Sequence, residues 1–372
     1  MNHPEPTAAE PNPDARYRFG VVGAAMRAEY YLRIARALPD RFEVTGAVAR
    51  NPDRARAFSR RWDCPTFPTI DEMLKHTRPE FVITAVNWEQ NAAVTAQLVE
   101  LGMPVLAETP PASTLEGLLE LHALVQRRGG RVQVAEGVPL RPRHQAQLAV
   151  VAKGWLGRVT QAQISVAHGY HGIALMRKLL GIGFEHCRVT ARSFSSPLVK
   201  SLGPEGTPEQ ETTHDSQQYL FWFDFGDRLG VMDFTFDQYW SWVRNERTLI
   251  RGERGEIIGD TIHYLKDHKT PMRLELCPHR PDRTTIVEGY FLKGIQVGED
   301  WVYTNPLVPA NLPDDEIAGG VVMANMGKYV RTGVPFYSLA DGMQDHYLYL
   351  VAQRALGAEA SLATDTMPWA TP

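Results

Sequence analysis

The sequence has few cysteines and no long apolar run, and each of these absences excludes a class of protein. Its three cysteines, Cys64, Cys187 and Cys277, are far apart and form no Cys-x-x-Cys pair. This pattern argues against a disulfide framework and a zinc knuckle, and we expect a reducing, cytoplasmic compartment. No stretch approaches the roughly 18 consecutive apolar residues of a membrane span. Residues 1–15 lack the basic start and apolar core of a signal peptide.

The net charge is small: the chain has 39 Lys and Arg and 43 Asp and Glu, which gives a formal charge of −4. Such a balance offers no global attraction to nucleic acid or to an anionic membrane, so a small-molecule ligand is expected. A chain of 372 residues exceeds the size of one typical core, which predicts two domains. The acidic, proline-rich residues 1–15 are expected to form a disordered tail.

From residue 16 to about 140 the sequence alternates strand-like and helix-like segments. Strands are predicted at 18–22, 42–51, 79–86, 104–108 and 131–137, with helices between them. Strands rich in Val, Ile and Ala that alternate with helices predict a parallel sheet covered on both faces. This part is expected to be a doubly wound, Rossmann-type domain.

After about residue 142 the strands become aromatic and alternating, which is typical of half-exposed antiparallel sheets. Strands are predicted at 159–170, 217–226, 228–240 and 284–291, and helices at 171–181 and 341–356. We therefore expect residues 141–372 to form an α+β domain with an open, mostly antiparallel sheet.

The stretch GVVGAAMRA follows the first strand and opens the first helix. A dinucleotide-binding fold carries Gly-x-Gly-x-x-Gly at this place, because glycines let the backbone approach a pyrophosphate at the helix N-terminus. Gly23 is present, whereas Ala25 and Ala28 replace the other two glycines. Together with Met26 and Arg27, this turn is predicted to contact the cofactor.

The end of the second strand predicts which cofactor is bound. An acid there would hold the ribose 2′-hydroxyl of NAD(H), but the chain has Ala49, Arg50 and Asn51. An Arg without a neighbouring acid can make a forked contact to a 2′-phosphate, so NADP(H) is favoured and NAD(H) stays possible. The alternative is that Arg50 is an ordinary solvated residue at a helix start.

Several segments in order, namely the Gly23 turn, FVITAV, ELGMPVLAE, the ETP step, GWLGRV and YHGIALMRKLLG, resemble one family. From about Arg16 to the C-terminal helix the chain is similar to the Gfo/Idh/MocA family (glucose-fructose oxidoreductase, inositol dehydrogenase, MocA). The resemblance implies a Rossmann domain followed by an open sheet domain, with the substrate between the nicotinamide and one sheet face. It also implies a homo-oligomer, a dimer or a tetramer.

The family's catalytic pattern is only partly present. Glu108, Thr109 and Pro110 occupy the place of Glu-Lys-Pro, so the family's lysine is missing. In the family's D-x-x-x-H pattern, Ala167 stands at the place of the Asp and His171 is retained. Ala174 stands at the place of a second Asp.

The resemblance also extends the cofactor site beyond the Gly23 turn. Asn91 occupies the place where the family frequently has His. The resemblance further implies cofactor contacts from Val86, Asn87, Glu108, Thr109 and Pro110. A cis bond before Pro110 is permitted.

Proton transfer has to come from another group, because a threonine hydroxyl does not ionise usefully. Thr109 is interpreted as a group that positions the substrate, or as a structural replacement. His168, Tyr170 and His171 lie together in AHGYHG, with His171 as the leading acid–base candidate. This His-x-x-His pair lacks a nearby carboxylate or cysteine at ligand spacing, so no metal is predicted.

Two further segments are candidates for the substrate pocket. His214 and Asp215 are predicted to precede a strand, where Asp215 can orient a histidine or cap a turn. The stretch DQYWSWVRNE is interpreted as a strand that presents aromatic rings and an Arg suited to a sugar. Packing against a partner subunit explains the same residues. The candidates in this stretch are Tyr239, Trp240, Trp242 and Arg244.

The resulting hypothesis is an NADP(H)-dependent oxidoreductase acting on a secondary alcohol or ketone of a sugar, polyol or related cyclic compound. Two alternatives stay open. One is a glycoside-cleaving enzyme that recycles a tightly bound nicotinamide nucleotide, and the other is a catalytically silent nucleotide-binding regulator. The histidines of AHGYHG favour an enzyme, whereas Thr109 and Ala167 favour the catalytically silent regulator.

Overall fold

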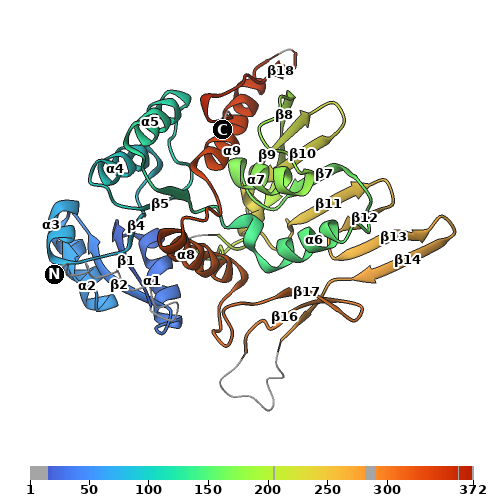
Figure 1. The fold of residues 1–372 in the computed structure, drawn as a ribbon. Coiled ribbons are helices and arrows are strands. Elements are labelled where there is room, and N and C mark those ends of the chain that lie inside the picture. Colours follow the sequence, from blue (N-terminus) through green and yellow to red (C-terminus); the bar gives the residue numbers. More distant parts are fainter. Residues whose placement is uncertain (1–15, 204–205, 281–289, 359, 371–372) are drawn as a thin grey trace, which may run out of the picture.

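The computed structural model describes residues 16–203, 206–280, 290–358 and 360–370. The tail predicted at residues 1–15 and most of the strand predicted at 284–291 lie outside this range. Figure 1 shows an α/β part, coloured blue to teal, beside a second part built on a larger sheet. The predicted fold class, a parallel sheet followed by a mostly antiparallel one, is confirmed.

The first sheet has six parallel strands in the order β3-β2-β1-β4-β5-β6. Its strands are β1 (Tyr17–Val22), β2 (Phe42–Val48), β3 (Thr66–Phe67), β4 (Phe81–Thr84), β5 (Val105–Ala107) and β6 (Val132–Val134). The helices are α1 (Met26–Ala37), α2 (Pro52–Trp62), α3 (Ile70–His76), α4 (Trp88–Glu100) and α5 (Leu115–Arg128). In this strand order, which is that of the Rossmann fold, ligands bind at the strands' carboxyl ends where the order reverses, between β1 and β4.

The second sheet has nine strands in the order β14-β13-β12-β11-β7-β10-β9-β8-β18. Its neighbouring strands are antiparallel except for β7 and β10, which are parallel. The strands are β7 (Val159–Ser165), β8 (Arg188–Val199), β9 (Thr213–Asp224), β10 (Leu229–Thr235), β11 (Arg247–Gly252), β12 (Gly255–Ile258), β13 (Thr261–Asp267), β14 (Thr270–Glu275) and β18 (Leu362–Ala363). A small sheet contains β15 (Cys277–His279), β16 (Gly294–Val297) and β17 (Asp300–Thr304).

The remaining helices follow the first sheet in the chain. They are α6 (Pro142–Ala152), α7 (Gly169–Leu180), α8 (Asp314–Thr332) and α9 (Leu339–Ala355), with the short turns η1 (Val138–Leu140), η2 (Phe236–Tyr239) and η3 (Pro368–Ala370). Helix α7 packs against α9, β7 and β10. Among the described residues, no helix is long and apolar enough to cross a membrane.

Helix α8 belongs to the segment assigned to the second domain, yet it packs on α1 of the first (Figure 1). Its glycines permit this close approach, because a Cβ on Gly319 would lie 2.2 Å from the Tyr30 hydroxyl oxygen. Met323 and Met326 join the same apolar cluster as Phe19 of β1. Helix α8 therefore lies between the two parts and contacts the first of them. The domain boundary at residue 140/141 stays a prediction.

Candidate functional site

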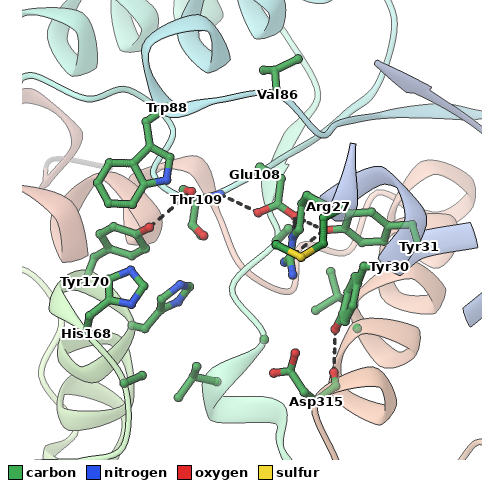
Figure 2. A pocket seen from close by; sticks show the side chains of 18 of the residues that line it. Arg27, Tyr30, Tyr31, Val86, Trp88, Glu108, Thr109, His168, Tyr170 and Asp315 are labelled. Atoms are coloured by element: carbon green, nitrogen blue, oxygen red, sulfur yellow. Dashed lines mark hydrogen bonds and ion pairs between the residues drawn. The ribbon is translucent and has the colours of Figure 1, made fainter. Parts of the chain in front are cut away.

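A cavity of about 660 Å³ lies where the carboxyl ends of the Rossmann strands face the second part of the chain. One side is formed by the start of α1 and by the residues that follow β4, β5 and β6. The opposite side is formed by the start of α7 and by η2, while α8 lies beside α1. Figure 2 shows these side chains pointing into the same space from both sides. The cavity coincides with the switch point at which Rossmann folds bind ligands.

The turn before α1 is suited to a phosphate group. Gly23 has φ +130°, and a Cβ there would lie 2.1 Å from the Ala85 carbonyl oxygen, so the turn needs glycine. Ala25 is the N-cap of α1 and provides no side-chain hydrogen bond. The first N–H groups of the helix therefore stay available to an anion such as a pyrophosphate. These main-chain N–H donors fit the pyrophosphate of a dinucleotide. Met26 and Arg27, the first two residues of the helix, line the adjoining cavity.

Glu108, which follows β5, is held by three donors. It accepts hydrogen bonds from Arg27 Nε, from the Tyr31 hydroxyl and from the main-chain N–H of Thr109. Arg27 and Glu108 form an ion pair at the cavity wall, visible in Figure 2. Side chains supply two of the three donors to Glu108, and its predicted contact with the cofactor stays a prediction.

Asn91 lies outside the cavity lining, so its contact with the cofactor stays a prediction. Asn91 is 1% exposed, and its side chain is bonded to protein groups inside the molecule. Its Nδ2 donates to the carbonyl oxygens of Glu108 (2.6 Å) and Pro110 (2.8 Å), and its Oδ1 accepts from Thr84 Oγ1 (2.6 Å). Asn91 thus supports the turn that carries Glu108 and Thr109. The Thr109–Pro110 bond in this turn is cis.

The residues predicted to contact the adenosine end lie outside the cavity lining. Ala49 is buried at the end of β2. Arg50 is exposed, and its guanidinium donates to Gln90 Oε1 at 3.1 Å. The side chain of Asn51 is the N-cap of α2 and accepts from the N–H groups of Asp53 and Arg54. Cofactor contacts from Ala49, Arg50 and Asn51 stay a prediction.

On the opposite wall the structure brings His168, Tyr170 and His171 together. They do not share a strand face: β7 ends at Ser165, His168 is the N-cap of α7, and the helix begins at Gly169. The His168 and His171 rings are 5.0 Å apart between centroids, and Tyr170 and His171 are 4.5 Å apart. The Tyr170 hydroxyl donates to the Thr109 carbonyl oxygen, which connects the two walls (Figure 2).

His168 and Tyr170 are each held in the neutral form. Burial, with a smaller contribution from His171, lowers the pKa of His168 to about 3. Its Nδ1 is 2.6 Å from the Tyr239 hydroxyl, whose own pKa is raised by burial to about 12. Burial, followed by the negative charge of Glu136, raises the pKa of Tyr170 well above its usual value. Neither His168 nor Tyr170 is therefore suited to carry charge at neutral pH.

His171 differs from these two residues because a carboxylate contacts it. Its Nδ1 lies 2.7 Å from Oε2 of Glu136, which is 1% exposed. Glu136 follows β6 directly and was not identified from the sequence. Its position could have indicated it, because Glu108 and Glu136 follow neighbouring parallel strands, and the carboxyl ends of such strands lie at one edge of a sheet.

Trp88 was also missed, although it begins α4 directly after the loop that follows β4. Its ring lies 6.2 Å from that of His168 and 5.8 Å from that of Tyr170, in the view of Figure 2. Trp88, Val86 and Asn87 all line the cavity. An aromatic surface therefore lies beside the histidines.

Arg141 and Asp315 supply further lining residues that the sequence did not indicate. Arg141 Nε and Nη2 both donate to Asp315 Oδ1, at 3.2 and 3.0 Å. Its remaining terminal nitrogen donates to Glu246 Oε1 at 3.3 Å. The guanidinium of Arg141 is therefore paired with two carboxylates, those of Asp315 and Glu246.

The prediction of a regular strand through DQYWSWVRNE is wrong. Strand β10 ends at Thr235, whose hydroxyl caps the 3₁₀ turn η2, and the chain then turns before β11. Tyr239 lines the cavity, whereas Trp240, Trp242 and Arg244 lie outside its lining. With no strand to align them, these three residues share no sheet face.

His214 and Asp215 lie within β9 and not before a strand. His214 Nε2 contacts Asp237 Oδ1 at 2.8 Å, so Asp237 and not Asp215 orients this ring. Both residues lie outside the cavity lining, which leaves a role in substrate binding as a prediction. Within the described parts of the chain, no cluster of three or more His, Cys, Asp or Glu side chains could hold a metal ion.

Residues 17–136 match the model of the Gfo/Idh/MocA family, described as an oxidoreductase family with an NAD-binding Rossmann fold. An uncharacterized oxidoreductase of Rhizobium meliloti, ORF334, is 29% identical over 147 residues, which cover 39% of this chain and 44% of that protein. The chain spans less than half the length of the curated relatives that it matches.

Two solved structures have the same fold over nearly the whole chain. An oxidoreductase from Agrobacterium radiobacter, in complex with NAD+, L-tartaric acid and magnesium, has a TM-score of 0.67 at 14% identity and covers 93% of this chain and 98% of its own. A levoglucosan dehydrogenase in complex with NADH and levoglucosan has a TM-score of 0.68 at 15% identity, covering 94% and 99%. The fold of both parts is thus shared with these proteins.

Proposed function

Because residues 17–136 match the NAD-binding Rossmann model of the Gfo/Idh/MocA oxidoreductase family, we propose that this chain is an NADP(H)-dependent oxidoreductase of that family. Its substrate would be a secondary alcohol or ketone of a sugar, polyol or related cyclic compound. The observation that carries this proposal is the cavity in which Glu108 and Thr109, after β5, face His171 at the start of α7.

The nicotinamide nucleotide, when bound, supplies the hydride acceptor or donor. The start of α1 would hold its pyrophosphate, and Val86, Asn87 and Glu108 would line its nicotinamide end. His171 Nε2 takes the hydroxyl proton during oxidation of the alcohol and returns it during reduction of the ketone. Thr109 offers one hydrogen-bond donor and one acceptor that position the reacting oxygen.

The preference for NADP(H) rests on the end of β2. Arg50 is exposed there, and its guanidinium donates one hydrogen bond to the uncharged amide oxygen of Gln90, a partner that a phosphate can replace. We expect Arg50→Glu to weaken NADPH binding by about 10- to 100-fold, the effect of a lost charge-assisted hydrogen bond, and to leave NADH binding nearly unchanged. Arg56→Ala on the exposed face of α2 is the control. An unchanged NADPH affinity in Arg50→Glu would remove Arg50 from the site.

The sugar or polyol class is supported by the lining of the cavity. Trp88, Tyr170 and Tyr239 give apolar faces of the kind that stack on sugar rings. The levoglucosan dehydrogenase of the same fold was solved with a sugar derivative, as its name states.

Native mass spectrometry of the purified protein, followed by titration with NADPH and NADH, tests the cofactor and counts the subunits. Reversible uptake of NADPH, together with nucleotide-dependent oxidation of a sugar or polyol, is the expected result. A nucleotide retained at one per subunit with no net turnover would favour the glycoside-cleaving alternative. Binding of a nucleotide without turnover of sugars, polyols or glycosides would favour the regulatory alternative, and binding of neither nucleotide would overturn the proposal.

A further inference from the structure

The proton-transfer role of His171 leaves a question about the carboxylate that usually accompanies such a histidine. The residue four positions before His171 is Ala167, which has no carboxylate. Ala167 is 1% exposed and lines the cavity near His171. In its place the carboxylate of Glu136 reaches His171 from the other side of the cavity, 35 positions earlier in the chain.

We propose that Glu136 is the positioning residue for His171, and that it fixes the imidazole tautomer that leaves Nε2 free to accept a proton. This inference rests on the proposed oxidoreductase function. A carboxylate can only accept hydrogen bonds, so the proton of the neutral ring has to lie on Nδ1, which faces Glu136. Nε2 then carries the free lone pair.

The surroundings of Glu136 hold it in one orientation. Oε2 contacts His171 Nδ1, and Oε1 accepts a hydrogen bond of 2.9 Å from the main-chain N–H of Val138 at the start of η1. With one oxygen fixed by the backbone, the other is aimed at the ring. The contact joins the end of β6 to the start of α7, and so spans the two walls of the cavity.

The atoms of His171 are placed for this role. The side chain is 19% exposed at the cavity, whereas that of Glu136 is 2% exposed. Within the described part of the chain, Nδ1 has Glu136 as its partner and no hydrogen bond to Nε2 is recorded. The titratable groups that line the cavity with His171 come from both walls. They are His168 and Tyr170 at the start of α7, Tyr239 of η2, Arg141 before α6, Glu108 after β5, Glu89 of α4, Asp315 of α8, and Arg27, Tyr30 and Tyr31 of α1.

The proton and hydride balance follows from this arrangement. During oxidation the substrate O–H proton would move to His171 Nε2 and a carbonyl would form, and a bound nicotinamide nucleotide would supply the acceptor for the hydride released from the same carbon. His171 becomes an imidazolium, whose positive charge lies against the Glu136 carboxylate. Reduction reverses both transfers, and the ring returns to the Nδ1–H tautomer. Glu136 itself keeps no proton in either direction.

Glu136→Gln tests the role with little change in shape. If the Gln carbonyl keeps the Val138 hydrogen bond, its NH₂ group faces Nδ1 and favours the opposite tautomer, with the proton on Nε2. We expect kcat for alcohol oxidation to fall by about 100- to 10,000-fold, the range for loss of a general base, while nucleotide affinity is retained. Glu116→Gln, at the exposed start of α5, is the matched control.

The wild-type protein provides a measurement that needs neither turnover nor a stable variant. Nitrogen-15 NMR of the histidine rings, with His171 assigned through His171→Gln, should show the Nδ1–H tautomer for His171. An Nε2–H tautomer in the wild type, or an unchanged kcat in Glu136→Gln, would overturn the role of Glu136. Failure to bind either nucleotide would instead overturn the proposed function and leave the tautomer result standing.

Discussion

The side-chain amide of Asn91 donates a 2.6 Å hydrogen bond to the main-chain carbonyl of Glu108, and in this way α4 holds the turn after β5. The same amide donates to Pro110. Asn91→Ala would leave both carbonyls without this donor inside the molecule. We expect the free energy of unfolding to fall by about 2–6 kcal/mol, since each of these two unsatisfied buried carbonyls costs about 1–3 kcal/mol.

Urea denaturation measures this loss. Gln97→Ala, at an exposed position of the same helix, should change the free energy by less than about 0.5 kcal/mol. A stability loss for Asn91→Ala no larger than that of Gln97→Ala would show that the turn does not depend on the amide. A loss of nucleotide affinity in Asn91→Ala would follow from displacement of Glu108.

Two buried histidines should make stability decrease in mild acid. Burial lowers the pKa of His144 to about 3 and that of His346 to about 4, from an ordinary value near 6.5. Below pH 6.5 the unfolded chain binds protons at these positions that the folded chain does not bind. The contribution of these neutral histidines to the free energy of unfolding is therefore fully present above about pH 6.5. As the pH falls toward 4, this contribution decreases by about 1.4 kcal/mol per pH unit for each residue.

His144→Gln isolates one of these contributions. His144 Nδ1 donates to the Val138 carbonyl at 2.6 Å, and a Gln amide can keep a donor in this region without titrating. Between pH 6.5 and 4.5, the slope of unfolding free energy against pH should be smaller in the variant by about 1.4 kcal/mol per pH unit. His263→Gln, at an exposed position of β13, should retain the wild-type slope. Equal slopes in wild type and His144→Gln would contradict the lowered pKa.

The fold was largely predictable because hydrophobic periodicity is a local property. Each of the five predicted Rossmann strands overlaps one of the structure's strands, and the helices predicted at 171–181 and 341–356 correspond to α7 and α9. Short or polar elements were missed. Strand β3 has two residues, and β8 is exposed on both faces around Arg192, Ser193 and Ser195, which gives a weak apolar signal.

The site was predictable only where a residue lies beside a recognisable turn. Thr109 and His171 follow such turns, and the structure places both at one cavity. Glu136 contacts His171 across 35 positions, and Asp315 reaches Arg141 across 174. These pairs depend on how the two parts of the chain pack, which no local pattern specifies. The strand expected through Trp240 failed for a local reason, since Thr235 and Gln238 form a capping box that starts a turn.

Thr109 is expected to position the substrate without taking part in proton transfer. Thr109→Val keeps the shape of the side chain and removes its hydroxyl. Loss of one hydrogen bond of about 0.5–1.5 kcal/mol corresponds to a decrease in kcat/KM of about 2- to 12-fold. The pH dependence of kcat/KM should be the same as in the wild type, because a threonine hydroxyl does not titrate in this range. Disappearance of a limb of the profile would place Thr109 in the proton path instead.

The charges of the cavity predict that the substrate is uncharged. Both arginines that line it are already paired, Arg27 with Glu108 and Arg141 with Asp315 and Glu246. No lysine lines this cavity within the described residues. A substrate carboxylate would therefore meet carboxylates and no available cation, which is unfavourable in a partly buried site.

Matched pairs of a neutral sugar and its uronic acid, such as glucose and glucuronate, test this prediction through their kcat/KM values. The neutral member should be the better substrate in the wild type. Asp315→Asn should raise the ratio of acid to neutral kcat/KM, because it removes one of the two carboxylates that neutralise Arg141. Asp300→Asn, whose carboxylate pairs with Lys153 away from the cavity lining, should leave the ratio unchanged. A wild-type preference for the acid would mean that Arg141 exchanges Asp315 for the substrate, so that the ion pair is a carboxylate site held by a competing side chain.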